Sequence, residues 1–293
     1  MMTKAPIFIV GMQRSGTTFL RLILNRSDEL FIPFETDFIS AAENFSDVDF
    51  SDANQKKAII SAIESEPFTQ KAGLTLNHTE SIENATNMTE LLDAFFTDNC
   101  LQHNKKRWGI KTPGYILSMH KVLNYFPNAR FIVVMRDPRG IFYSQKNISW
   151  GLKDPVKLAY QWNQANHNVE LIERLFPQQI YVLKYEQLIE QIEPETQKLC
   201  QFIDLSFSDK LLDFSNAATD MPESSKQWHQ SSVSKPDLDK IIAWQQHLKP
   251  VEKKVIQDIC EEFLCKWDYS IDLSHVRKLD KLKHKLEYAF HYA

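Results

Sequence analysis

The sequence predicts an α/β fold in which a parallel β-sheet lies between two layers of helices. Three observations favour this fold class: short apolar runs rich in β-branched residues recur along the chain, stretches with helical periodicity separate them, and the strongest run is fully apolar. A fully apolar run is typical of a parallel strand that is covered on both faces. With 293 residues the chain can bury a large core, and we expect a single domain over residues 1–293.

The predicted strands and helices alternate along the chain, as in parallel α/β proteins. The strands are expected at residues 6–10 (PIFIV), 130–135 (RFIVVM) and 180–183 (IYVL). The helices are expected at 19–24, at 115–126, at 156–176, from about Pro194 onward, at 238–248 and at 250–265.

Three stretches fall outside this alternation. Residues 40–105 are polar, with helical patches at 54–64 and 89–103, and we expect an insertion or lid on the core. Residues 216–237 form a polar stretch whose length is typical of functional or disordered loops. Residues 274–293 repeat apolar side chains at three- and four-residue steps, which predicts a basic amphipathic helix. We expect that helix to pack on the body or on a second subunit, as in a homodimer, and contact with a membrane surface is the weaker alternative.

Composition argues against several classes of protein. A net charge of −4 argues against a nucleic-acid binder, and no apolar stretch is long enough for a membrane span. The first residues lack the pattern of a signal peptide, so a cytoplasmic protein is expected. The sequence has four cysteines: Cys100, Cys200, Cys260 and Cys265. They lack the spacing of a zinc site or of a disulfide framework, so we expect no metal.

The stretch GMQRSGTTFL places Gly11 and Gly16 five residues apart, between a predicted strand and a predicted helix. A loop of this kind offers free backbone N–H groups and the positive end of a helix dipole to a phosphate. Loops for magnesium nucleotides carry Lys after the second glycine, whereas this chain has Thr17. A P-loop kinase is therefore the weaker enzymatic alternative. A nucleotide-binding module without catalysis is the non-enzymatic one.

A second phosphate contact is predicted where the strand at 130–135 ends. Arg136 follows that strand, and Ser144 lies eight residues on, in the next helix. Both can converge on one phosphate at the carboxyl edge of the sheet, where α/β proteins bind ligands. The alternative is a local ion pair of Arg136 with Asp137, a role that would also suit Arg139.

Taken together, PIFIVGMQRSGTTFLRLIL and FPNARFIVVMRDPRGIFYSQ resemble the sulfotransferases that use 3′-phosphoadenosine-5′-phosphosulfate. The resemblance implies a P-loop NTPase-like fold, this donor with its bisphosphate product, and no metal. It implies that the 3′-phosphate is held by Arg136 and Ser144. The residues that would wrap the 5′-phosphosulfate are Arg14, Ser15, Gly16, Thr17 and Thr18.

Two further stretches resemble the same family. YVLKYEQL matches its strand–Tyr-Glu-x-Leu–helix segment, which implies that Tyr185 lies near the adenine. The polar loop ending in SSVSKP resembles the loop that closes over the nucleotide, with Lys235 reaching its phosphates.

The expected general base is Glu35, in the stretch FIPFETDFI and 21 residues after Arg14. The aromatic neighbours Phe34 and Phe38 would partly desolvate a carboxylate, which favours a raised pKa. This spacing resembles the tyrosylprotein branch of the family, where such a glutamate is the base. The small-molecule branch uses a histidine instead, for which His78 and His103 are the nearest candidates.

The resemblance also implies that Lys111, in RWGIKTPGY, stabilises the bridging oxygen, while Arg14 serves the sulfuryl oxygens. The sequence departs from the tyrosylprotein branch at Ile148, where that branch has an arginine, and Lys146 is the candidate substitute. The expected acceptor is a hydroxyl of a small molecule, glycan, lipid or peptide tyrosine.

Overall fold

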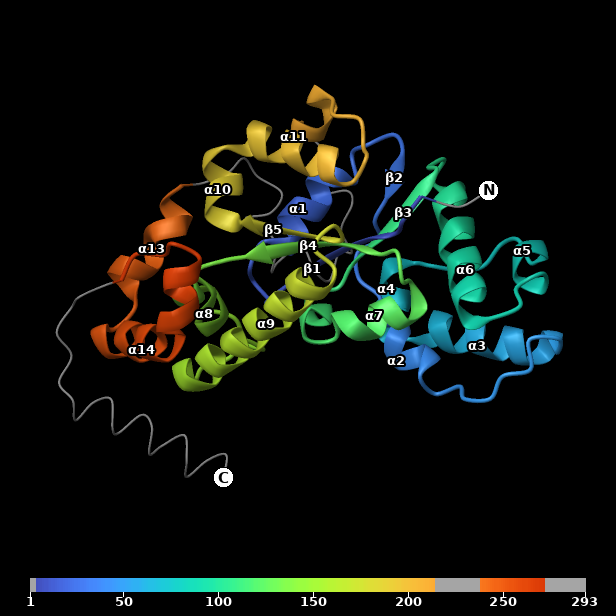
Figure 1. Cartoon of the computed structure of the whole chain (residues 1–293), viewed down its shortest axis with the longest axis horizontal. Helices are drawn as coiled ribbons and strands as arrows, with labels where there is room; N and C mark the ends of the chain where they lie inside the picture. The colour runs from blue at the N-terminus through green and yellow to red at the C-terminus, as the bar shows by residue number, and fades with distance from the viewer. Residues whose placement is uncertain (1–3, 214–237, 272–293) are drawn as a thin grey trace.

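The computed structural model describes residues 4–213 and 238–271 and confirms the α/β fold, with helices on both faces of a parallel sheet (Figure 1). The described sheet has the strand order β2-β3-β1-β4-β5. Its strands are β1 (Ile7–Gly11), β2 (Leu30–Phe31), β3 (Arg107–Lys111), β4 (Arg130–Met135) and β5 (Ile180–Lys184). The predicted loop 216–237 with Lys235 and the predicted helix 274–293 lie outside the described residues.

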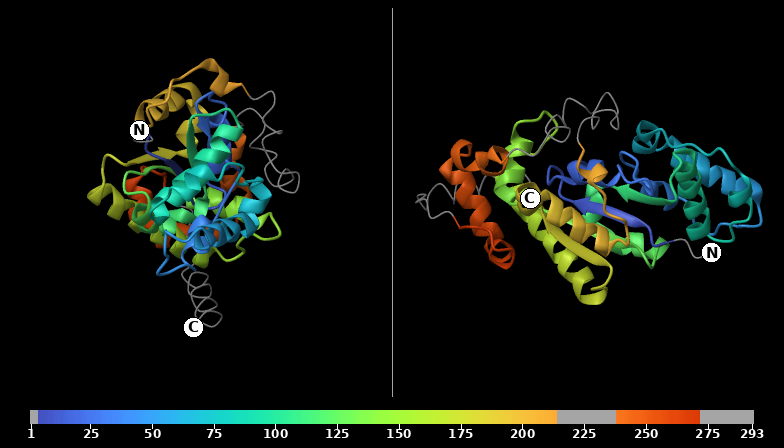
Figure 2. Two further views of the ribbon diagram at one scale, coloured as in Figure 1. Left: turned by 90° about the vertical axis from the view of Figure 1, so that its right-hand side faces the viewer. Right: turned by 90° about the horizontal axis from the view of Figure 1, so that it is seen from above.

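The helices form two groups, those of the insertion and those that follow or precede it along the chain. The insertion carries α2 (Phe38–Ala42), α3 (Ala53–Ser65), α4 (Pro67–Ala72), α5 (Glu80–Glu83) and α6 (Met88–Gln102). The others are α1 (Thr17–Leu24), α7 (Met119–Tyr125), α8 (Pro138–Lys146), α9 (Pro155–Leu175), α10 (Tyr185–Glu190), α11 (Ile192–Phe202), α13 (Asp239–His247) and α14 (Pro250–Lys266), with 3-10 turns η1 (Pro113–Leu117) and η2 (Asp209–Leu212). Figure 2 shows α3–α6 at one end of the molecule and α14 at the other.

Alternate side chains of β1 point to opposite faces of the sheet, and each face has its own core. Ile7 and Ile9 pack in a cluster with residues of α1, α10 and α11. Phe8 and Val10 pack in a larger cluster with residues of α6, α7, α9 and α14. These four side chains are fully buried, which explains why the strand reads as a continuous apolar run.

The insertion shares the larger core with the sheet. Phe96 of α6 lies with its ring centroid 4.8 Å from that of Trp108 in β3, and 5.5 Å from that of Phe38. The helical patches predicted at 54–64 and 89–103 correspond to α3 and α6.

Two predicted helices differ from the structure. The helix predicted at 115–126 is divided into η1 and α7, because Ser118 between them has φ −139° and ψ 29°. The helix predicted from Pro194 begins two residues earlier, at Ile192. Proline fits there because the first N–H groups of a helix have no partner within the helix.

The strand order creates a crevice at one edge of the sheet. The chain passes from β1 to β2 and β3 on one side, and then crosses to β4 and β5 on the other. Ligands of α/β proteins bind where the order reverses, beyond the carboxyl ends of the strands. Here those ends belong to β1, β3 and β4, which continue into residues 12–16, 112–113 and 136–137.

Candidate active site

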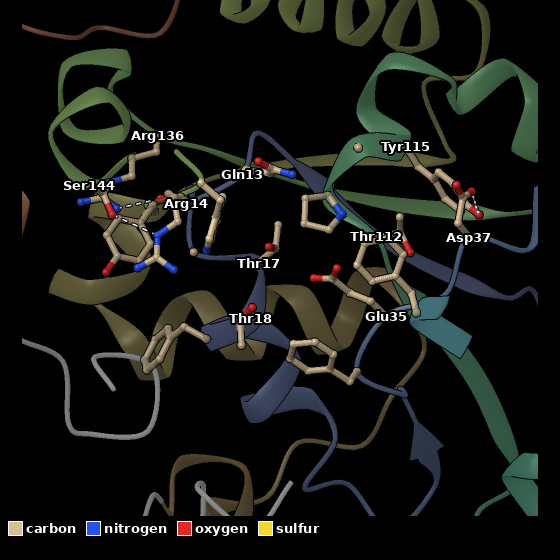
Figure 3. A pocket seen from close by; sticks show the side chains of 18 of the residues that line it. Gln13, Arg14, Thr17, Thr18, Glu35, Asp37, Thr112, Tyr115, Arg136 and Ser144 are labelled. Carbon is tan, nitrogen blue, oxygen red and sulfur yellow. Dashed lines mark hydrogen bonds between the residues drawn. The ribbon is translucent and has the colours of Figure 1, made fainter. Parts of the chain in front are cut away.

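A cavity of about 910 Å³ opens beyond the carboxyl ends of β1, β3 and β4. Its labelled side chains fall into two groups, with Gln13, Thr17 and Thr18 between them (Figure 3). We call one group the arginine end; it contains Arg14, Arg136 and Ser144. We call the other the glutamate end; it contains Glu35, Asp37, Thr112 and Tyr115.

The loop after β1 is shaped by two residues with left-handed backbone angles. Arg14 has φ 74° and Gly16 has φ 107°. A side chain at Gly16 would also be blocked, because its Cβ would lie 2.2 Å from the ring of Tyr185. Tyr185 therefore packs directly on the loop. Ser15 lies beneath the loop, where its backbone N–H donates a hydrogen bond to the carbonyl oxygen of Met12. The Ser15 side chain is fully buried, and its Oγ has no hydrogen-bond partner among the described residues.

The arginine end is joined by hydrogen bonds between the two segments that the sequence singled out. Arg136 donates to the carbonyl oxygen of Arg14 at 2.8 Å, and Arg14 Nε donates to Ser144 Oγ at 3.1 Å. The Arg136 guanidinium also lies 4.5 Å from the centroid of the Tyr185 ring. Burial, followed by the neighbouring charge of Arg136, lowers the pKa of Arg14 below its usual value. Two cations held side by side in this way suit an anion that bridges them.

The arginine end carries no described carboxylate on its cavity wall; Lys240 adds a third cationic residue there. Asp137 is engaged elsewhere, since Arg139 donates to it through Nε at 2.9 Å and through a terminal nitrogen at 2.7 Å. The ion pair with Asp137 that the sequence offered as an alternative role for Arg136 is thus formed by Arg139. Lys146 does not line the cavity, because it pairs with Glu252 of α14 at 2.5 Å.

At the glutamate end, Glu35 faces the cavity and Lys111 lies beneath it. Lys111 Nζ donates to Glu35, and the Lys111 side chain is fully buried, while that of Glu35 is 20% exposed. Lys111 Nζ also lies 4.5 Å from the centroid of the Phe34 ring. Burial lowers the pKa of Lys111, and the neighbouring Glu35 carboxylate opposes that shift. Lys111 is therefore placed to orient Glu35 and does not itself line the cavity.

The segment that carries Glu35 is held from several sides. The buried Arg21 of α1 donates to the carbonyl oxygens of Ile32 and Pro33, both at 2.9 Å. Thr112 donates to the carbonyl oxygen of Thr36 at 2.6 Å. These contacts connect the helix behind the phosphate loop to the residues on both sides of Glu35.

Two residues of the glutamate end were missed in the sequence, Asp37 and Tyr115. The Tyr115 hydroxyl donates to Asp37 Oδ1 at 3.1 Å, and Ser40 Oγ donates to Asp37 Oδ2 at 2.7 Å. Burial and then the Asp37 charge raise the pKa of Tyr115 well above 10. One pattern could have found Asp37: it lies two residues after Glu35, and side chains two apart in an extended segment share a face.

The two histidine alternatives lie away from the cavity. His78 Nδ1 is 2.6 Å from Asp98 Oδ1, and the His78 side chain is 75% exposed. His103 stacks on Phe31 with ring centroids 4.0 Å apart. No histidine of the described residues lines the cavity, so the structure brings only the glutamate candidate to it.

Within residues 4–213 and 238–271, no three or more His, Cys, Asp or Glu side chains group in a way that could hold a metal ion. All four cysteines are free. None of the helices described for this chain is both long and apolar enough to cross a membrane.

Comparison with known proteins identifies relatives of this chain. Residues 6–209 match the sulfotransferase family. The chain is 26% identical to a candidate protein-tyrosine sulfotransferase of Caenorhabditis briggsae over 70% of its own length and 68% of that protein. It is 27% identical to protein-tyrosine sulfotransferase A of Caenorhabditis elegans over 83% of its length, and it spans only 61% of that relative. The fold is similar to the sulfotransferase domain of the Synechococcus PCC 7002 olefin synthase, with a TM-score of 0.56, 18% identity and coverage of 100% and 98%.

Proposed function

Because this chain belongs to the sulfotransferase family, we propose that it transfers the sulfuryl group of 3′-phosphoadenosine-5′-phosphosulfate to an acceptor hydroxyl. The observation that carries this proposal is the division of one cavity into an arginine end and a glutamate end. The first suits a donor with several anionic groups, and the second offers a base for the acceptor.

The arginine end supports the identity of the donor. The loop residues Gly16, Thr17 and Thr18 begin α1 and line the cavity, where helix N-termini favour phosphate groups. Arg136 and Ser144 line the same end and would hold the 3′-phosphate, since arginine matches a tetrahedral anion with two parallel donors. We assign Lys235 to the donor as well, on the resemblance alone.

The glutamate end supports proton transfer to a carboxylate. Glu35 accepts the proton of the acceptor hydroxyl as that oxygen forms its bond to sulfur. Lys111, held beneath Glu35, keeps the carboxylate oriented toward the cavity. When bound, the donor supplies the sulfuryl group and a phosphate that leaves with the electron pair of the broken bond. Arg14 stabilises the negative charge that develops around the sulfuryl group and the departing 5′-phosphate.

A phenol is the acceptor hydroxyl that suits this base best. A tyrosine-like phenol has a pKa near 10, so a carboxylate can assist its ionisation with less mismatch than for an aliphatic alcohol. The relatives named as protein-tyrosine sulfotransferases support the same choice.

Calorimetry with adenosine 3′,5′-bisphosphate and with AMP tests the donor assignment. Because Arg136 and Ser144 face the cavity, the bisphosphate should bind at least tenfold more tightly, as expected for one additional charge-assisted contact. Equal affinities would contradict the proposal. The kinase alternative predicts tighter binding of a magnesium nucleotide, and a module without catalysis predicts bisphosphate binding with no transfer.

A further inference from the structure

One carboxylate at the glutamate end has no part in the proposed transfer. Asp37 lines the same cavity as Glu35, two residues along the chain. Its two oxygens each accept one hydrogen bond, from Tyr115 and from Ser40. Because a carboxylate oxygen has two lone pairs, each can accept another donor. No lysine, arginine or histidine of the described residues forms an ion pair with Asp37.

A second carboxylate adds to the negative charge around Asp37. Glu66 accepts a hydrogen bond from the backbone N–H of Asp37 at 3.1 Å. The backbone and hydroxyl donors that surround Glu66 lower its pKa, against the effect of burial, so it stays ionised. After burial itself, the charges of Asp37 and Glu66 both contribute to the raised pKa of Tyr115. Asp37 and Glu66 thus place two negative charges close to the Tyr115 hydroxyl at this part of the wall.

The other two carboxylates that line the cavity are neutralised by ion pairs. Glu35 pairs with Lys111, and Glu43 pairs with Lys121 at 2.9 Å. Outside the arginine end, the remaining cationic residue among the described lining residues is Lys71 of α4, which is exposed. Among the described lining residues, Asp37 is therefore the carboxylate whose charge no ion pair offsets.

We propose that Asp37 selects acceptors in which a protonated amine lies close to the reacting phenol. This inference rests on the proposed function, because it assumes that the phenol faces Glu35. Two residues of extended chain span about 7 Å at most, so a small acceptor can reach Glu35 and Asp37 together. An ammonium group donates to the open lone pairs of Asp37, whereas an anionic group meets like charge. The substrate class is thus a small phenolic amine.

Three phenols of similar size test this selection: tyramine, which is cationic, 4-ethylphenol, which is neutral, and 3-(4-hydroxyphenyl)propionate, which is anionic. We expect kcat/KM for tyramine to exceed that for 4-ethylphenol roughly tenfold, as befits a partly exposed charge pair, with the propionate lowest. In Asp37→Asn the ratio of tyramine to 4-ethylphenol should fall to about one. Asp52→Asn is the matched control: Asp52 caps α3 outside the cavity, asparagine caps equally well, and the wild-type ratio should persist.

Adenosine 3′,5′-bisphosphate affinity, measured on each protein, separates the two proposals. If the wild-type protein does not bind the bisphosphate, the proposed function fails. If it binds the bisphosphate but does not sulfate tyramine, or sulfates all three phenols equally, the inference about Asp37 fails alone. The same holds if Asp37→Asn keeps the wild-type preference. A second measurement needs no variant: raising the ionic strength should reduce the advantage of tyramine in the wild-type protein, and an unchanged ratio would overturn the assignment.

Discussion

At the arginine end the cavity wall carries three cationic residues and no described carboxylate, whereas the rest of the wall, which includes the glutamate end, carries three carboxylates and two lysines. Arg136 donates a hydrogen bond to the carbonyl oxygen of Arg14, which holds the two cationic side chains at the same end. Glu35, by contrast, is paired with a fully buried lysine. One end therefore presents a fixed positive field, and the other presents carboxylates in defined orientations.

This difference indicates that the two ends contribute to different steps. A fixed cationic field binds an anionic donor before any reaction begins. An oriented carboxylate has little effect on donor binding but acts when a proton must leave the acceptor. Changes at the two ends should accordingly separate affinity from turnover.

The largest expected effect is on turnover, from Glu35→Gln. The amide keeps the shape of the side chain but cannot accept the proton, so kcat should fall about 10²-fold or more. Affinity for adenosine 3′,5′-bisphosphate should stay within a factor of two or so of wild type, since Glu35 lies at the other end of the cavity. Steady-state kinetics and calorimetry on one preparation measure both. A near-normal kcat would remove Glu35 from the role of base.

Arg136→Ala should show the opposite pattern, with a smaller magnitude. Loss of a charge-assisted contact to the 3′-phosphate should weaken bisphosphate binding by about 10- to 100-fold while AMP binding changes much less. Calorimetry with both nucleotides measures the difference. Equal losses of affinity for the bisphosphate and for AMP would show that Arg136 supports the loop through Arg14 and does not contact the 3′-phosphate.

Gly16→Ala tests whether the loop geometry of the arginine end matters. The left-handed φ of 107° and the contact with Tyr185 should destabilise the loop by about 1–3 kcal/mol and weaken bisphosphate binding accordingly. Gly114→Ala is the matched control, because Gly114 lines the same cavity but a Cβ there would meet nothing within 4 Å. If the two variants bind the bisphosphate with equal affinity in calorimetry, the loop does not require glycine at position 16.

The smallest expected effect concerns pH and a carboxylate behind the arginine end. Burial raises the pKa of Glu186 above 4.5, against the opposing charge of Arg136, so the folded protein holds a proton that the unfolded chain releases. The free energy of unfolding should then fall as the pH rises from about 4.5 through the raised pKa. Glu186→Gln should lack this slope in denaturant titrations between pH 4 and 7. If the free energy of unfolding changed with pH in the same way in both proteins, the raised pKa of Glu186 would be contradicted.

Much of the fold could be predicted from the sequence because its central strands are apolar and continuous. β1 and β4 are buried on both faces and were identified at nearly their observed bounds. β2 has two residues, and β3 contains Arg107 and Lys111 with a glycine between, so neither shows the period or composition of a strand. Phe31 of β2 and Trp108 of β3 are buried in a cluster with Phe95 and Phe96 of α6, a tertiary contact that the composition of the two strands does not show.

The candidate site was predictable where a residue type and its spacing carry the chemistry. Arg14, Arg136, Ser144 and Glu35 all line one cavity, as expected. The arrangement of Lys111 beneath Glu35 could not be read from spacing, because 76 residues separate them and the pairing of β2 with β3 brings their segments together.

Transfer of labelled sulfate from 3′-phosphoadenosine-5′-phosphosulfate to a phenol in the presence of EDTA tests the central claim most directly. If the arginine end binds the donor and the glutamate end accepts the proton, a labelled phenyl sulfate and adenosine 3′,5′-bisphosphate should form in equal amounts. The rate should not change when magnesium is added. Binding of the donor without transfer to any hydroxyl, or transfer that appears only when magnesium is restored, would contradict it.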